Sequence, residues 1–193
     1  MSSYDLVLAI ALGVGLAAAT GFRVFLPMLI VSGAAYSGSL PLGESFAWLA
    51  TPSALTMLAV AALVETVAYY VPGVDNLLDT LATPAAFIAG TAVSAAVMND
   101  VSPLMKWTTA VIAGGGVAGL TQSMTALLRA KSTVLTGGLG NAALATAEVG
   151  GALTVSILAL AAPLAAVLVV GLLPWLAVRL LRIVSRRAGR PSA

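Results

Sequence analysis

The chain has 193 residues, of which 60% are hydrophobic and only 8% are charged, with a formal net charge of +2. Soluble domains carry roughly one quarter charged residues, so a mean hydropathy of +1.06 indicates an integral membrane protein. The sequence contains no cysteine and no histidine. It therefore excludes disulfides, the usual zinc and copper ligands, and thiol or imidazole catalysis, and we expect no metal and no cofactor.

Apolar runs of about 20 residues predict an all-α, polytopic membrane helix bundle with about six transmembrane helices. These helices are expected at 5–33, 54–71, 84–98, 104–128, 140–161 and 164–182. The first run is long and contains Thr20, Gly21, Arg23 and Pro27, which favour a kinked or broken helix. We expect one transmembrane domain over 1–183, followed by a basic cytoplasmic tail over 184–193. The N-terminus lacks a basic region, which argues against a cleaved signal peptide.

Basic residues predict the orientation. They crowd the C-terminus, at Arg179, Arg182, Arg186, Arg187 and Arg190, and the positive-inside rule places such clusters in the cytoplasm. An even number of spans then puts both termini in the cytoplasm and the 34–53 loop, which lacks Lys and Arg, outside. Only Lys106 disagrees with this assignment. We expect a multi-pass protein of a bacterial inner membrane, with anionic lipid headgroups as partners of the C-terminal arginines.

The two halves of the chain share features that indicate a 3+3 inverted repeat, over 5–100 and 104–183. Glu65 and Glu148 each follow an alanine-rich run, and each precedes a proline, Pro84 or Pro163, that opens the next apolar segment. Three spans in one copy would make the second copy enter the membrane from the opposite side. The glycines at 114–116 are a second candidate break or close-packing point.

Three strings carry a resemblance to a known family: GFRVFLP at 21–27, VPGVDNLLD at 71–79 and RAKSTVLTGGLGN at 129–141. With Glu65 and Glu148, they resemble a bacterial membrane family known as domain of unknown function 4126 (DUF4126). The resemblance covers most of the chain. It implies a small polytopic membrane protein and directs attention to those positions, but it implies no substrate.

Glu65 and Glu148 are the first candidate site residues because both lie near the middle of predicted spans. A carboxylate at that depth is costly, so it is expected to face protein or water, to pair with a cation or to be protonated. Arg23 in the first span is the natural partner, and Asn141 shares a helical face with Glu148. Two interpretations remain: an ion or substrate pathway, or a structural Arg–Glu pair that holds helices together.

Two predicted cytoplasmic loops supply secondary candidates. Asp75 and Asp79 share one face of a short amphipathic helix, which could attract a cation at a pore mouth but is more typical of a solvated polar face. Arg129 and Lys131 lie in a glycine-containing segment that could bind an anion. The same segment is equally explained as a positive-inside loop.

These residues favour a small inner-membrane transporter or channel, proton- or cation-linked through Glu65 and Glu148, with Arg23 as counter-charge. The alternatives are a transporter of an anionic or phosphorylated lipid-type substrate met by Arg23, Arg129 and Lys131, and a non-transporting scaffold or assembly factor. An enzyme is not expected, because no Ser/Lys pair or metal-ligand set accompanies the two glutamates. The expected partners are the lipid bilayer, a small ion or small molecule, and a second copy through glycine-rich faces. We expect no nucleic acid partner.

Overall fold

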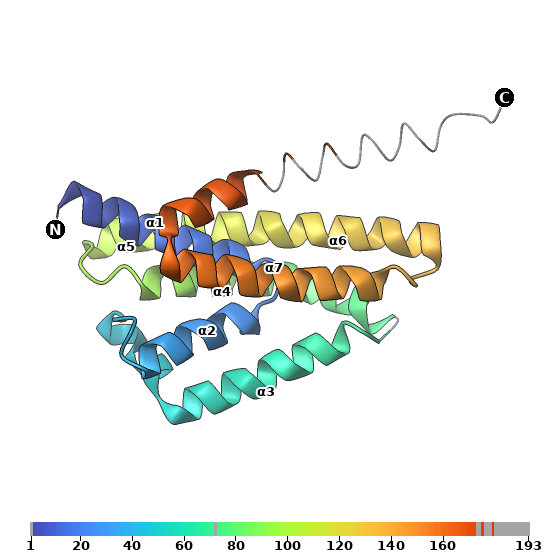
Figure 1. The fold of residues 1–193 in the computed structure, drawn as a ribbon, viewed down its shortest axis with the longest axis horizontal. Helices are drawn as coiled ribbons and strands as arrows, with labels where there is room; N and C mark the ends of the chain where they lie inside the picture. The colour runs from blue at the N-terminus through green and yellow to red at the C-terminus, as the bar shows by residue number, and fades with distance from the viewer. Residues whose placement is uncertain (1, 72, 173–174, 176–178, 180–193) are drawn as a thin grey trace.

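The computed structural model of the protein describes residues 2–71, 73–172, 175 and 179. All regular structure in this part is helical (Figure 1). In chain order the elements are α1 (Ser3–Thr20), α2 (Phe25–Tyr36), the 3₁₀ helix η1 (Glu44–Ala50), α3 (Pro52–Ala68), α4 (Val74–Ala96), α5 (Pro103–Thr109), the π-helical turn η2 (Ala110–Gly115), α6 (Gly116–Thr136) and α7 (Asn141–Ala161). A further apolar helix is described over Pro163–Leu172.

The helices have the length and surface of membrane spans. In the described part of the chain, 4 helices are long and apolar enough to cross a bilayer, or up to 5 if η1 and α3, which meet at 70°, form one span. Large apolar side chains such as Met57, Leu104 and Val134 point outward and are exposed. Such a surface would be unusual in a soluble monomer but suits a lipid environment. The predicted all-helical membrane bundle is confirmed, and the number of about six spans is not.

The first predicted span is broken, as its glycine and proline indicated. α1 ends at Thr20 and α2 begins at Phe25, and Figure 1 shows that α2 runs back toward the end from which α1 came. The break lies against α6, because a Cβ atom added to Gly21 would come within 2.5 Å of the carbonyl oxygen of Ala118. Glycine therefore allows the reversal to enter the bundle interior.

This reversal changes the expected topology. The N-terminus and the 37–43 segment lie at one end of the bundle, and the 137–140 turn lies at the other (Figure 1). Arg129 and Lys131 precede that turn. The N-terminus and the 129–141 segment therefore lie at opposite ends of the bundle, and they cannot both face the cytoplasm as predicted. α1 and α5 also begin at the same end, whereas an inverted repeat needs opposite ends. The inverted repeat is thus not confirmed, and the C-terminal tail predicted at 184–193 lies outside the described residues.

Cysteine labelling tests this arrangement in a chain that has no cysteine of its own. Single variants Ser3→Cys and Ser39→Cys are expected to react with an impermeant maleimide from the same side of the membrane. Ser3 is the first residue of α1 and Ser39 belongs to the 37–43 segment, and both the start of α1 and this segment lie at one end of the bundle. Leu139→Cys, 88% exposed at the other end, is expected to react only from the opposite side. Labelling of Ser3→Cys and Leu139→Cys from one side would contradict the reversal.

The half of the bundle nearest the N-terminus is closed by small side chains. A Cβ atom added to Gly90 of α4 would lie 2.4 Å from the Cβ of Ala118 in α6, and one added to Gly114 would lie 2.6 Å from the Cβ of Ser94. Gly114 and Gly115 belong to the η2 turn and form a close-packing point, as the sequence suggested, whereas a Cβ atom added to Gly116 would meet nothing within 4 Å. Such contacts let two helix backbones approach directly.

Gly90→Ala is expected to lower the free energy of unfolding by about 1–3 kcal/mol, because the added methyl group overpacks a rigid contact. Gly150→Ala is the matched control: it is also inside a helix, yet its added Cβ atom would meet nothing within 4 Å. That variant is expected to be neutral or stabilising by up to about 1 kcal/mol. Reversible denaturation in mixed detergent micelles measures both, and equal effects would show that α4 and α6 do not meet at Gly90.

Candidate functional site

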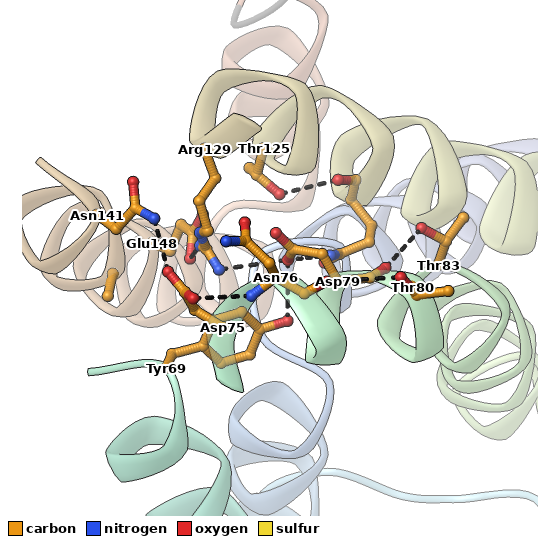
Figure 2. Close-up of polar contacts among 12 residues, drawn as sticks. Tyr69, Asp75, Asn76, Asp79, Thr80, Thr83, Thr125, Arg129, Asn141 and Glu148 are labelled. Atoms are coloured by element: carbon orange, nitrogen blue, oxygen red, sulfur yellow. Dashed lines mark hydrogen bonds and ion pairs between the residues drawn. The ribbon is translucent and has the colours of Figure 1, made fainter. Parts of the chain in front are cut away.

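Arg129 of α6 is buried at the centre of a group of charged side chains, with only 1% of its surface exposed. Its guanidinium donates to Oδ1 of Asp79 at 3.3 Å and to both carboxylate oxygens of Glu148. Figure 2 shows Arg129 extending from α6 toward the carboxylate of α7. Gln122, on the same face of α6, also donates to Oδ1 of Asp79 at 3.3 Å. One side chain thus links α4, α6 and α7.

Arg23, in the break between α1 and α2, contacts the same carboxylate of Glu148. Its Nη2 atom lies 3.0 Å from Oε2 of Glu148 and donates to the carbonyl oxygen of Ala145 at 3.3 Å. The predicted pairing of Arg23 with a membrane-depth glutamate is therefore confirmed for Glu148. The guanidinium carbons of Arg23 and Arg129 both lie over the ring of Tyr69, at 3.8 and 4.4 Å from its centroid.

Asp75 and Asp79 are inside the bundle, so the expectation of a solvated polar face is wrong. Only 2% of Asp75 is exposed, and its carboxylate accepts from the Nδ2 atom of Asn141 at 2.6 Å (Figure 2). Asp79 accepts from the hydroxyl of Tyr69 at 3.3 Å. The predicted loop is in fact the beginning of α4, which starts at Val74 and not near Pro84. The acidic face of this helix can be buried because polar groups of other helices meet it: Arg129 of α6 pairs with Asp79, and Asn141 of α7 donates to Asp75.

Glu65 has a different environment from Glu148. Its two carboxylate oxygens accept from the backbone N–H groups of Val24 and Phe25, at 2.8 and 3.0 Å. These are among the first donors of α2, which have no partner within the helix and lie at the positive end of its dipole. α2 has no cap from its own residues, so Glu65 of α3 caps it. The capped residues, Val24 and Phe25, directly follow Arg23 in the chain. Arg23 therefore connects Glu65 to the group around Glu148.

We call these six side chains the charged cluster: Arg23, Glu65, Asp75, Asp79, Arg129 and Glu148. If all were ionised, it would hold two more negative than positive charges. Three buried polar atoms around it have no hydrogen-bond partner among the described residues: Nε of Arg23, Nε of Arg129 and Oδ1 of Asn141. In the same part of the chain, no three acidic side chains are close enough to share a metal ion. The two Nε–H groups could donate to a small polar ligand and the Oδ1 atom could accept from one, while the excess of carboxylates could take up a proton.

In the part of the chain that the structure describes, two cavities reach the cluster, and Tyr69 lines both. The smaller, of about 160 Å³, is a mouth between Tyr69, Tyr70 and Asp75 on one side and the 137–142 segment on the other, at the end of the bundle opposite the N-terminus. The larger, of about 1060 Å³, is an open apolar groove between α2, α3 and α4. We refer to them as the mouth and the groove. The cluster is thus accessible from one end and from the side of the bundle.

Sequence reasoning missed two residues of this site and misplaced others. Tyr69 lies under both arginines and is not among the predicted site residues. Gln122 is not among them either, although a glutamine within an apolar run was a visible signal. Asn141 is buried at the cluster as its shared face with Glu148 predicted. Lys131, by contrast, is exposed on another face of α6 than Arg129. Arg182, Arg186, Arg187 and Arg190 lie outside the described residues.

The fold and this site define a class: a membrane-embedded helical bundle with a buried, net acidic cluster beside a broken helix. The chain belongs to the family described as domain of unknown function (DUF4126), whose model matches residues 10–183. The predicted resemblance is therefore confirmed over most of the chain. Neither the curated proteins nor the solved structures contain a significant match to this chain.

Proposed function

We propose that the protein is a small, non-enzymatic transporter or channel of the bacterial inner membrane, in which the charged cluster binds and relays a proton or a hard cation. The observation that carries the proposal is the excess of buried carboxylates over arginines in the cluster. Ionisable groups at membrane depth are expensive to bury, and they usually mark ion pathways or proton relays. Unlike a balanced ion pair, an acidic excess has the capacity to take up positive charge.

The routes to the cluster support this proposal. On one side, the mouth brings Asp75 and Asn141 close to the end of the bundle, and the unpartnered Oδ1 atom of Asn141 offers an acceptor there. On the other side, the contacts of Gly90 and Gly114 close the bundle, roughly 16 Å along α4 from Asp79 at 1.5 Å per residue. The core of the bundle is thus open at one end and closed at the other, while the groove lies along its side. A core that is closed at one end is the arrangement that alternating access requires. Arg129 and Lys131 near the mouth favour its placement on the cytoplasmic side.

The anionic-substrate alternative has less support. Arg23 and Arg129 are already engaged by Glu148 and Asp79, and Lys131 lies on another face of α6. An incoming phosphate would therefore have to compete with carboxylates for each buried guanidinium. The scaffold alternative makes a different prediction, because a purely structural cluster would move no ion.

Ion movement in proteoliposomes tests the proposal. Vesicles with and without the purified protein receive an inside-negative potential, while a trapped dye reports proton entry. Parallel vesicles report tracer exchange of Na⁺, K⁺ and Mg²⁺ against the same trapped ion. We expect the protein to accelerate the movement of at least one of these ions over empty vesicles. Rates equal to those of empty vesicles for all of them would overturn the proposal and leave the scaffold interpretation.

A further inference from the structure

The groove extends along almost the whole length of α3. Its walls include residues from Pro52, at the start of that helix, to Tyr69 just beyond its end, a distance of roughly 25 Å at 1.5 Å per residue. The opposite wall is formed by Leu78, Leu81 and Ala82 of α4. Apart from Glu65, the lining carries no charged side chain. The groove is thus a long apolar surface with a single acidic group near one end.

Glu65 retains acceptor capacity toward the groove. An ionised carboxylate has about four lone-pair positions, and the two backbone N–H groups of α2 occupy one on each oxygen. The remaining positions can receive a cation that lies in the groove. The ring of Phe25, which also lines the groove and is 38% exposed, offers an aromatic face of the kind that attracts such cations.

We infer that the groove binds an amphipathic cation, with its apolar body along α3 and its positively charged group at Glu65. This inference rests on the proposed transport function and names the substrate class of the same site. The charge of the lining decides between ligands: an anionic group placed at Glu65 would meet a carboxylate, and the nearest guanidinium groups, those of Arg23 and Arg129, are bound to Glu148. A cation finds an acceptor there without breaking an ion pair.

The position of Glu65 also connects such a ligand to the charged cluster. Glu65 holds the backbone N–H group of Val24, and the preceding residue, Arg23, pairs with Glu148. A cation that draws Glu65 away from α2 therefore acts on the segment that carries Arg23. Competition between this cation and a proton for Glu65 would couple the two movements, because a protonated carboxyl group is neutral and no longer attracts the cation.

Two probes of the same shape and opposite charge test the inference: tetraphenylphosphonium and tetraphenylborate. Equilibrium binding of each is measured on the full chain in lipid nanodiscs, with empty nanodiscs subtracted. We expect saturable binding of the phosphonium, weakened by Glu65→Gln by at least about tenfold and decreasing as the pH is lowered. The borate is expected to show only the partition seen in empty nanodiscs. Saturable binding of the borate alone, or of neither probe, would overturn the inference.

Glu65→Gln also changes the residue that caps α2. A pair of groove variants that leave Glu65 in place therefore tests the groove separately from this cap. Val64→Trp fills the groove beside Glu65 and is expected to abolish saturable phosphonium binding. Leu63→Trp is the matched control, because Leu63 is an equally exposed neighbour on α3 that does not line the groove, and it is expected to bind as wild type does. Equal binding by both variants would contradict the groove as the site. Ion movement without phosphonium binding would refute this inference alone, whereas binding without ion movement would refute the proposed function alone.

Discussion

Arg129→Ala is expected to lower the free energy of unfolding by about 3–5 kcal/mol, the usual cost of leaving a buried charge without its partner. Arg129 is 1% exposed and contacts both Asp79 and Glu148. Its loss would therefore leave two buried carboxylates without that counter-charge and would increase an existing acidic excess. The effect is measured by reversible denaturation in mixed detergent micelles.

Lys131→Ala is the matched control, because it removes a positive charge from the same helix at an exposed position. Its effect is expected to stay within about 0.5 kcal/mol. Combining Arg129→Ala with Asp79→Asn should recover part of the lost stability, because Asp79 loses its ion pair with Arg129 and then becomes neutral, whereas Glu148 keeps Arg23. A cost for Arg129→Ala as small as that of Lys131→Ala would mean that the charged cluster contributes nothing to the folded state.

The residues that sequence reasoning located best are those that contrast with their surroundings. Arg23, Glu65 and Glu148 are isolated charges in long apolar runs, and the cost of such placement makes them conspicuous without any structure. Their pairing was only half predictable. Glu148 meets Arg23 directly, whereas Glu65 caps a helix that exists only because the first span is broken.

Three other residues were harder to assign: Arg129, Asp75 and Asp79. A prediction from hydropathy alone ends a helix where charged residues begin. α6 continues to Thr136 and α4 begins at Val74, since the charges of each helix are satisfied by residues distant in the chain. Such contacts between residues distant in the chain cannot be predicted from the hydropathy of a short stretch of sequence. The reversal between α1 and α2 was unpredictable for a similar reason: Gly21 and Pro27 indicate a break, but the direction of α2 after it goes with its packing against α3 and α7.

The second large effect concerns function: Glu148→Gln is expected to abolish ion movement while the protein remains folded. Glutamine keeps the shape of the side chain but cannot ionise, so it can neither release a proton nor neutralise a bound cation. The amide oxygen of glutamine can still accept hydrogen bonds from Arg23 and Arg129, so the side-chain contacts of the site can persist. Both buried arginines nevertheless lose an ion pair, and we expect a stability cost of about 3–5 kcal/mol, similar to that of Arg129→Ala.

Glu44→Gln provides the control for this variant, because Glu44 is an exposed carboxylate of η1 outside the charged cluster. It is expected to match wild type in both stability and ion movement. Reduced ion movement in Glu44→Gln would mean that the loss of any carboxylate impairs reconstitution. A low rate in Glu148→Gln could then no longer be assigned to the charged cluster. Helical content and monodispersity in detergent check that each variant enters the vesicles folded.

The most direct measurement is therefore the initial rate of ion movement in proteoliposomes that contain equal amounts of wild-type protein, Glu148→Gln or Glu44→Gln. For the ion that wild type moves, the account predicts that Glu44→Gln keeps the full rate and that folded Glu148→Gln falls to the rate of empty vesicles. A wild-type rate in folded Glu148→Gln would contradict the account, because the carboxylate at the centre of the charged cluster would then take no part in moving the ion.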